Sequence, residues 1–219
     1  MAVLGVGRPK RPRAIAQGVP AWLWACWGAG LVFAVAAKPA RGRGARLAAA
    51  ASTAVCVAFF RDPDRDGGDA EFVAPADGRI TAVERQSDGR WRVTIYMSLR
   101  DVHVNRAPAD GTVIGLEHHP GGHLPAFDKD SDRNERMHWT FATPRGPVEL
   151  IQIAGMLARR IVPYQWPGDT VLCGERIGLI RFGSRVDVIL PRDVRPDVTV
   201  GDRARAGVSS LATGYSSPA

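Results

Sequence analysis

The chain is poor in cysteine and, over most of its length, in lysine. Its three cysteines, Cys26, Cys56 and Cys173, are too few and too scattered for a disulfide framework or a four-ligand zinc site. Lys129 is the only lysine after residue 61. Hydrophobic residues make up 45% of the 219 residues and charged residues 23%, which excludes a wholly disordered chain and predicts one sizeable core or two small ones.

Acidic residues are absent from the first 61 positions. That segment holds nine lysines and arginines, whereas residues 62–219 hold twenty basic and twenty-two acidic residues, a net charge of −2. The formal charge of +7 therefore belongs to the N-terminus. Because the remainder is nearly neutral, we expect no surface that follows nucleic-acid phosphates and no nucleic-acid partner.

The N-terminal segment is typical of a membrane anchor. Residues 14–37 contain no charge and carry tryptophans near their start, and about 20 helical residues span the roughly 30 Å core of a bilayer. A second apolar run, residues 47–60, reaches only about 21 Å as a helix. We interpret residues 1–61 as a basic helical anchor in or on the cytoplasmic leaflet of the cell membrane. A cleaved signal peptide and a buried helical hairpin are the open alternatives.

Residues 62–219 are predicted to form one β domain. Residues 61–68, charged and glycine-bearing, favour a linker in front of it. Beyond them, short β-prone runs alternate with Gly, Pro and Asp, which indicates a mostly antiparallel fold. The clearest runs are residues 79–83, 91–97, 148–153, 176–182 and 186–190. Residues 116–134 predict a long loop, and because the histidines in it lack a dependable ligand spacing we expect no metal site.

Single polar residues of this domain are ambiguous as catalytic groups. Asp77 lies in a Pro-x-Asp-Gly turn signal, and such aspartates usually only shape the turn. His103 follows the predicted strand 91–97, where a histidine is more often structural. Ser184 follows Gly183 between two predicted strands, and a Gly-Ser pair ordinarily closes a hairpin.

Five motifs taken in order are far more specific. They are Ala-Pro-Ala-Asp-Gly at 74–78, Tyr-Met-Ser-Leu-Arg-Asp-Val-His-Val-Asn-Arg-Ala-Pro at 96–108, Asn-Glu-Arg at 134–136, Ile-Ala-Gly-Met-Leu-Ala-Arg-Arg-Ile-Val at 153–162, and Gly-Glu-Arg-Ile-Gly-Leu-Ile-Arg-Phe-Gly-Ser-Arg-Val-Asp at 174–187. This set resembles phosphatidylserine decarboxylases, specifically the short branch also found in archaea. The resemblance covers roughly residues 59–192, and an apolar N-terminus is also typical of that family.

The resemblance implies an enzyme that makes its own cofactor. Self-cleavage between Gly183 and Ser184 would give a β chain, residues 1–183, and an α chain, residues 184–219, that starts with a pyruvoyl group made from Ser184. The pyruvoyl ketone would form a Schiff base with phosphatidylserine and accept the electrons left by carbon dioxide, giving phosphatidylethanolamine. The implied partners are phosphatidylserine, the lipid bilayer, and the two chains of the cleaved protein as a heterodimer or higher oligomer.

The resemblance also implies roles for two more residues. His103 matches a histidine suited to donating the proton that replaces carbon dioxide, and Asp77 matches an aspartate near the cleavage site. Longer members carry a second histidine three residues after the first, as the base of an Asp-His-Ser triad for self-cleavage. Here that position is Arg106, a poor base. Either His103 serves both steps or Asp77 acts on Ser184 more directly.

The lipid head group carries a phosphodiester and a carboxylate, so arginines should line the site. Arg136, Arg159 and Arg160 are the candidates for substrate binding. Arg185, where longer members have threonine, is a second departure and is interpreted as a feature of the short branch.

Residues 198–207 also resemble the turn of biotinyl and lipoyl carrier domains, and with residues 74–83 they suggest a related β-sandwich or barrel hybrid. A membrane-anchored binding module without catalysis is therefore the alternative function. Carriers hold their cofactor on a lysine at a turn, but Lys129 stands in the predicted long loop, which favours a shared fold rather than a shared function. A serine hydrolase using Ser184 and His103 is a third class, but no Gly-x-Ser-x-Gly motif surrounds the serine.

Overall fold

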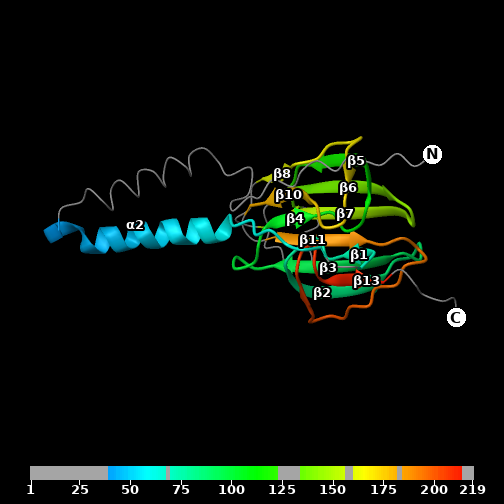
Figure 1. Ribbon diagram of the computed structural model, residues 1–219, viewed down its shortest axis with the longest axis horizontal. Helices are drawn as coiled ribbons and strands as arrows, with labels where there is room; N and C mark the ends of the chain where they lie inside the picture. The colour runs from blue at the N-terminus through cyan, green and yellow to red at the C-terminus, as the bar shows by residue number, and fades with distance from the viewer. Residues whose placement is uncertain (1–38, 68–69, 123–133, 156–159, 182–183, 214–219) are drawn as a thin grey trace.

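The computed structural model describes residues 39–67, 70–122, 134–155, 160–181 and 184–213. Among these residues a single helix, α2 (Pro39–Phe59), leads into a body of antiparallel strands and extends away from it (Figure 1). The strands are β1 (Phe72–Val73), β2 (Gly78–Arg85), β3 (Trp91–Met97), β4 (Val104–Arg106), β5 (Gly111–His119), β6 (Arg136–Thr143), β7 (Gly146–Ala154), β8 (Ile161–Pro163), β9 (Thr170–Val171), β10 (Arg176–Ile180), β11 (Ser184–Ile189), β12 (Arg203–Ala204) and β13 (Ser210–Ala212).

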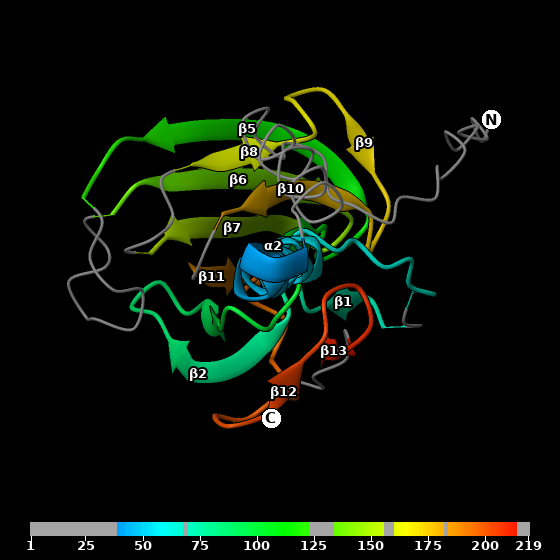
Figure 2. The same ribbon diagram turned by 90° about the vertical axis from the view of Figure 1, so that its left-hand side faces the viewer.

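Eight strands form one large sheet in the order β12-β2-β3-β11-β7-β6-β5-β9. A second sheet has the order β4-β10-β8, and β1 pairs with β13. Figure 2 shows the large sheet curving from β2 through β11, β7 and β6 to β5 as a half-barrel. The mainly β, antiparallel fold class predicted from the sequence is confirmed.

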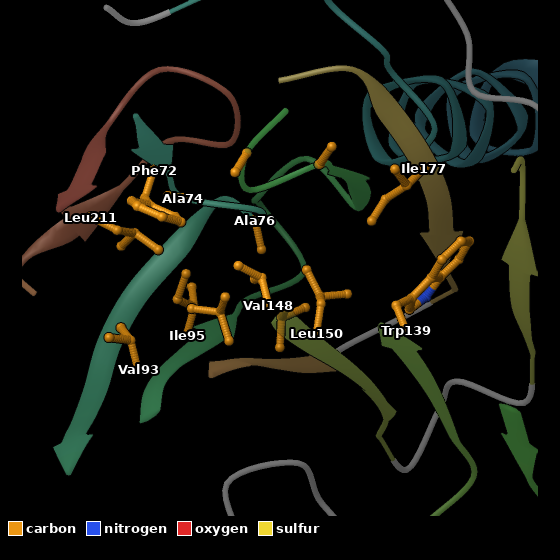
Figure 3. Close-up of a cluster of buried hydrophobic side chains, with 14 of the residues drawn as sticks. Phe72, Ala74, Ala76, Val93, Ile95, Trp139, Val148, Leu150, Ile177 and Leu211 are labelled. Carbon is orange, nitrogen blue, oxygen red and sulfur yellow. The ribbon is translucent and has the colours of Figure 1, made fainter. Parts of the chain in front are cut away.

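The main hydrophobic core lies between the large sheet and the smaller strands. Figure 3 shows Ile95 of β3 and Leu150 of β7 in the same cluster as Ile177 of β10 and Leu211 of β13. These side chains are almost completely buried, and each contributes about 1.5–3 kcal/mol by leaving water. The core therefore fixes the small sheets against the large one.

Strand β7 is buried on both faces at its C-terminal end. Successive side chains of a strand point to opposite faces, and Ile151 and Ile153 pack with Ile189 in a separate cluster. The alternate residues, Gln152 and Ala154, are fully buried as well. Polar groups at this end of the large sheet therefore lie in dry surroundings.

The five predicted strand runs correspond to observed strands, and the run 91–97 matches β3 at both ends. Two local expectations were wrong. Residues 116–119, predicted as loop, are the end of β5, where they pair with β6 residues from Trp139 to Arg136. Their glutamate and two histidines hid the strand, although backbone pairing tolerates these residues. Residues 123–133 of the predicted loop lie outside the described residues.

The expectation that the Gly-Ser pair closes a hairpin was also wrong. β10 pairs with β4 and β8, whereas β11 pairs with β3 and β7, so consecutive strands belong to different sheets. Between Ile180 and Ser184 the chain passes from the small sheet into the large one. Gly183 lies outside the described residues.

Helix α2 contains most of the predicted segment 47–60 but begins eight residues before it. Alanine is the best helix former, and residues 48–51 are all alanine. None of the helices described for this chain is long and apolar enough to cross a membrane. The other predicted anchor segment, residues 14–37, lies outside the described residues.

The predicted linker after the helix is attached to the β body by buried charges. Asp62 is fully buried, and Arg176 of β10 donates to its carboxylate at 2.8 Å. The side chain of Arg65 is 4% exposed and binds Asp77. The sequence predicted only a linker here. Asp62, Asp64 and Arg65 instead form ion pairs with the β body, which the local pattern does not reveal.

Candidate active site

The loop between β3 and β4 fixes the imidazole ring of His103. The backbone N–H and the hydroxyl of Ser98 both donate to the Asp101 carboxylate, at 2.8 and 2.7 Å, which closes a tight turn. The carbonyl oxygen of Asp101 then accepts a hydrogen bond from Nδ1 of His103 at 2.9 Å. Because a carbonyl oxygen can only accept, Nδ1 carries the hydrogen, and in the neutral ring the lone pair lies on Nε2.

Ser184 is the first residue of β11 and is fully buried. It pairs with Met97, the last residue of β3, and with Ala154, the last residue of β7. Its hydroxyl donates to the thioether sulfur of Met97 at 3.3 Å. Sulfur is a weak acceptor, so a stronger base can take its place as the partner of this hydroxyl.

His103 and Ser184 lie at the same end of the two sheets. The carbonyl of His103 accepts a hydrogen bond from the N–H of Ile180, the last residue of β10, and Ser184 follows only four positions later. The loop that ends in His103 also begins directly after Met97, the strand partner of Ser184. Two separate connections therefore place the predicted histidine and serine at the same end of the sheets.

The surroundings of His103 keep its ring neutral. Burial lowers the pKa of His103 to about 4, with a smaller lowering from Arg61, while the Asp101 carbonyl and the charges of Asp101 and Asp77 act in the opposite direction. At neutral pH the ring is therefore uncharged.

Asp77 is held in a different way. Both of its oxygens accept from Arg65, at 2.5 and 2.8 Å, and Oδ1 also accepts from the N–H of Ala206 at 2.8 Å. Burial raises the pKa of Asp77, but the hydrogen bonds from Arg65 and Ala206 and the Arg65 charge outweigh it, so the pKa is lowered. The next residue must be glycine, because at φ +152° a Cβ on Gly78 would collide with the Tyr96 carbonyl.

The two departures from the longer family members form structural contacts. Arg106 is buried and donates to the carbonyls of Gly174 and Pro63, both at 2.9 Å. Burial lowers the pKa of Arg106 to about 10, which still leaves it charged and unfit as a base at neutral pH. Arg185 donates to the buried carboxylate of Asp187 at 2.7 and 2.8 Å.

A buried chain of polar side chains, which sequence reasoning missed, ends at the same sulfur as Ser184. Trp139 donates to Gln152 at 2.7 Å, Gln152 donates to Asn105 at 2.7 Å, and Asn105 lies 3.7 Å from the Met97 sulfur. A glutamine between two isoleucines in a predicted strand was the available signal, because a buried polar side chain requires partners.

The predicted substrate-binding arginines are only partly assembled in the described residues. Arg160 is exposed, and its carbonyl accepts from the N–H of Arg181 at 3.3 Å. Arg181, not singled out from the sequence, is partly buried, and burial followed by the charge of Arg160 lowers its pKa. Arg136 of β6 pairs with Ile153 of β7. The next residue of β7, Ala154, is the strand partner of Ser184. Arg159 lies outside the described residues.

Comparison with known proteins places these residues in one family. A sequence profile described as phosphatidylserine decarboxylase matches residues 52–212. A phosphatidylserine decarboxylase proenzyme from Thermobifida fusca is 50% identical over 206 residues, 93% of this chain and 94% of that protein. One from Streptomyces avermitilis is 46% identical, covering 93% and 95%. A Methanosarcina acetivorans protein, provisionally named an archaetidylserine decarboxylase proenzyme, is 42% identical, covering 91% and 96%. These matches confirm the resemblance carried by the five motifs.

The buried histidine predicts a loss of stability in mild acid. The pKa of His103 is about 4 in the folded protein and about 6.5 in the unfolded chain. As the pH falls, the unfolded chain therefore binds a proton before the folded protein does. The free energy of unfolding should fall by about 2–3 kcal/mol between pH 7 and pH 4.5. Urea unfolding of the chain with Ser184→Ala, which keeps the polypeptide uncut, measures this. Adding His103→Gln should flatten the decline, and an equal decline in both proteins would contradict the assignment to His103.

Proposed function

Because the chain belongs to the phosphatidylserine decarboxylase family, we propose that it converts phosphatidylserine to phosphatidylethanolamine and carbon dioxide, as a carboxy-lyase of phospholipid biosynthesis. We propose further that its cofactor is a pyruvoyl group made from Ser184 by self-cleavage after Gly183. The observation that carries this is the buried Ser184 hydroxyl at the start of β11, beside the loop that ends in His103.

The surroundings of Ser184 fit a residue that is converted into such a group. Full burial keeps away the water that would compete with attack of the hydroxyl on the neighbouring carbonyl. Pairing with Met97 and Ala154 on both sides holds the backbone of residue 184 in one position. A pyruvoyl group supplies an electron sink for decarboxylation, the task of a pyridoxal cofactor in other enzymes.

We propose that His103 serves both steps. The lowered pKa keeps the ring neutral, so the lone pair on Nε2 can accept the proton of the Ser184 hydroxyl during self-cleavage, and because the ring is a weak base it holds that proton only transiently. In decarboxylation the same nitrogen, once protonated, returns a proton to the substrate carbon that has lost carbon dioxide. The low pKa makes the protonated ring a strong donor.

Asp77 is a weaker choice as the base that acts on Ser184. Its carboxylate is engaged by Arg65 and by the N–H of Ala206, and its lowered pKa disfavours proton uptake. We propose that Asp77 instead fixes the segment after α2 to the β body through Arg65, and stabilises a positive charge on His103 when it forms.

For the head group, we propose the arginines at the ends of β8 and β10. Arg160 and Arg181 are joined through their backbones, and the pKa of Arg181, lowered by burial and then by Arg160, would recover on contact with an anion. Arg136, close to the Ser184 row, is a third candidate. Phosphatidylserine is preferred to the archaeal ether lipid because the bacterial relatives of 46–50% identity are named for it.

We propose that residues 1–61 attach the protein to the cytoplasmic face of the membrane. Their charge of +9 favours an anionic leaflet, and α2 presents Leu47 and Val55, 71% and 68% exposed, outside the β body. Because α2 ends at the site, the attachment would bring the head group and His103 together.

Self-cleavage predicts two chains of defined mass. Purified protein should contain residues 1–183 and residues 184–219, the shorter blocked at its N-terminus by pyruvoyl, and Ser184→Ala should remain a single chain. Intact mass spectrometry measures both. A single uncut chain in both samples would exclude the pyruvoyl enzyme and favour the carrier-like binding module, whose possible lysine, Lys129, lies outside the described residues.

The identity of the base predicts opposite outcomes for two variants. During cell-free synthesis, His103→Gln should slow self-cleavage at least about 100-fold. Asp77→Asn should leave it measurable, because it removes the ion pair with Arg65 and the negative charge near His103 but not the proposed base. Arg65→Gln is the discriminating control. It frees the Asp77 carboxylate, so faster cleavage in this variant, together with fast cleavage in His103→Gln, would identify Asp77 as the base.

The membrane proposal predicts that acidic residues on α2 weaken lipid binding. Leu47→Glu combined with Val55→Glu should lower sedimentation with anionic vesicles, and decarboxylation of vesicle phosphatidylserine, by about tenfold or more. Activity on dispersed short-chain substrate should stay unchanged. Ile114→Glu with Val200→Glu adds the same charge at exposed apolar residues of the β body. Equal losses in both double variants would argue against α2 as the attachment site.

A further inference from the structure

The last residue of α2 packs directly on the proposed catalytic histidine. The rings of Phe59 and His103 lie with their centroids 4.2 Å apart and their planes tilted by 36°. Phe59 is 5% exposed and His103 is fully buried, so the contact is closed to water. Phe60, at 5.0 Å from Phe59 and edge-on to it, completes the aromatic cover.

A second contact holds the helix end to the same loop. Arg61 donates to the carbonyl of Ala58, in the last turn of α2, and to the carbonyl of Arg100, in the loop that leads to His103. Basic side chains near a helix C-terminus stabilise its free carbonyls, and here one arginine does so while it bridges to the loop. The helix end and the loop are therefore fixed to each other by a ring contact and by a hydrogen-bond bridge.

The hydrophobic cluster around this contact is separate from the main core. Phe59 and Phe60 are grouped with Val102, Val104 and Leu179, on either side of His103 in the chain and on β10. The ring of His103 is therefore enclosed partly by residues that precede the β body. Truncation of the chain at residue 60 would remove this cover as well as the helix.

We propose that Phe59 is a positioning residue for His103, which fixes the orientation of the imidazole ring and excludes water from it, so that the end of α2 is a part of the active site. The proposal rests on the proposed function, because it assigns to Phe59 an effect on the base and proton donor of that reaction. Phe59 itself forms or breaks no bond in this scheme.

The charged groups around His103 leave the effect of Phe59 identifiable. Asp101 acts from its own loop, Asp77 from the turn before β2, and Arg61 from the segment after α2. A substitution of Phe59 alters none of these charges. It changes the access of water, and burial is the largest cause of the lowered pKa of His103.

The titration of the His103 ring can be measured directly by NMR. In the uncut Ser184→Ala chain with labelled histidine, NMR titration should give a His103 midpoint near pH 4, with the signal assigned by its loss in His103→Gln. Phe59→Ala should raise that midpoint by about one pH unit or more, toward the usual value of about 6.5, because water reaches the ring. Phe59→Leu, which keeps an apolar cover, should raise it less.

Activity provides the second readout. In the self-cleaving chain, Phe59→Ala should move the pH profile of decarboxylation upward by the same amount as the NMR midpoint. Phe141→Leu is the matched control, because Phe141 is equally buried and stacked on an aromatic ring, but in the main core. Phe141→Leu should leave the His103 midpoint and the pH profile of decarboxylation the same as in the parent chain.

Two results would overturn the proposal. One is a His103 midpoint within about 0.2 pH unit of the parent in a Phe59→Ala chain whose spectrum stays dispersed. The other is an equal shift in Phe141→Leu. Failure of the proposed function is distinguishable. A chain that retains Ser184 and still stays uncut would exclude the pyruvoyl reaction, while the NMR titration of the Ser184→Ala chain still reports on the Phe59 contact.

Discussion

The position of Ser184 is decided by the pairing of β11 with β3 on one side and β7 on the other. This pairing sets Met97 and Ala154 beside the serine, and it buries the serine at the end of an inner strand of the large sheet. The polar chain from Trp139 through Gln152 to Asn105 then reaches the same point from the core side. His103 is brought there because its loop continues directly from Met97. The whole site therefore depends on the register of three neighbouring strands.

The two titratable groups of the site are both largely buried, but one is neutral and the other is charged. His103 has its Nδ1 hydrogen bond to a carbonyl and an aromatic cover, so that desolvation dominates and the ring stays neutral. Asp77 has a bidentate arginine and a backbone N–H, so that its charged form is favoured in spite of burial. Groups with pKa values moved in this way suit a neutral ring that passes on a proton readily and a fixed anion respectively. The charges that come with the segment after α2 are thus part of the site, and that segment belongs with the β body.

Much of the fold could be predicted from the sequence, and the residues of the candidate site could be named from it. Short alternating runs gave the antiparallel strands, and the five ordered motifs gave Ser184, His103 and Asp77, which the structure brings to one end of the sheets or to the segment bound there. The contacts that sequence reasoning missed join residues that are far apart in the chain. Arg65 is twelve residues from Asp77 in the chain, and Gln152 is forty-seven from Asn105, so neither contact leaves a local pattern. The passage of the chain between two sheets at Ser184 was hidden for the same reason, because hairpin expectations use only neighbouring residues.

The distribution of the last strands over the sheets has a kinetic consequence. β11 begins at Ser184, and β12 and β13 come after it. The strands that pair with these three, namely β3, β7, β2 and β1, all precede Ser184 in the chain. A cut before Ser184 would leave a short peptide whose three strands are all hydrogen-bonded to strands of the longer chain. Such a peptide leaves only when the sheet opens, so the product is held together without a covalent bond. Its formation, however, is tied to a continuous polypeptide. Refolding from separated chains would be a bimolecular search, with a rate that falls on dilution, whereas the first folding is independent of concentration.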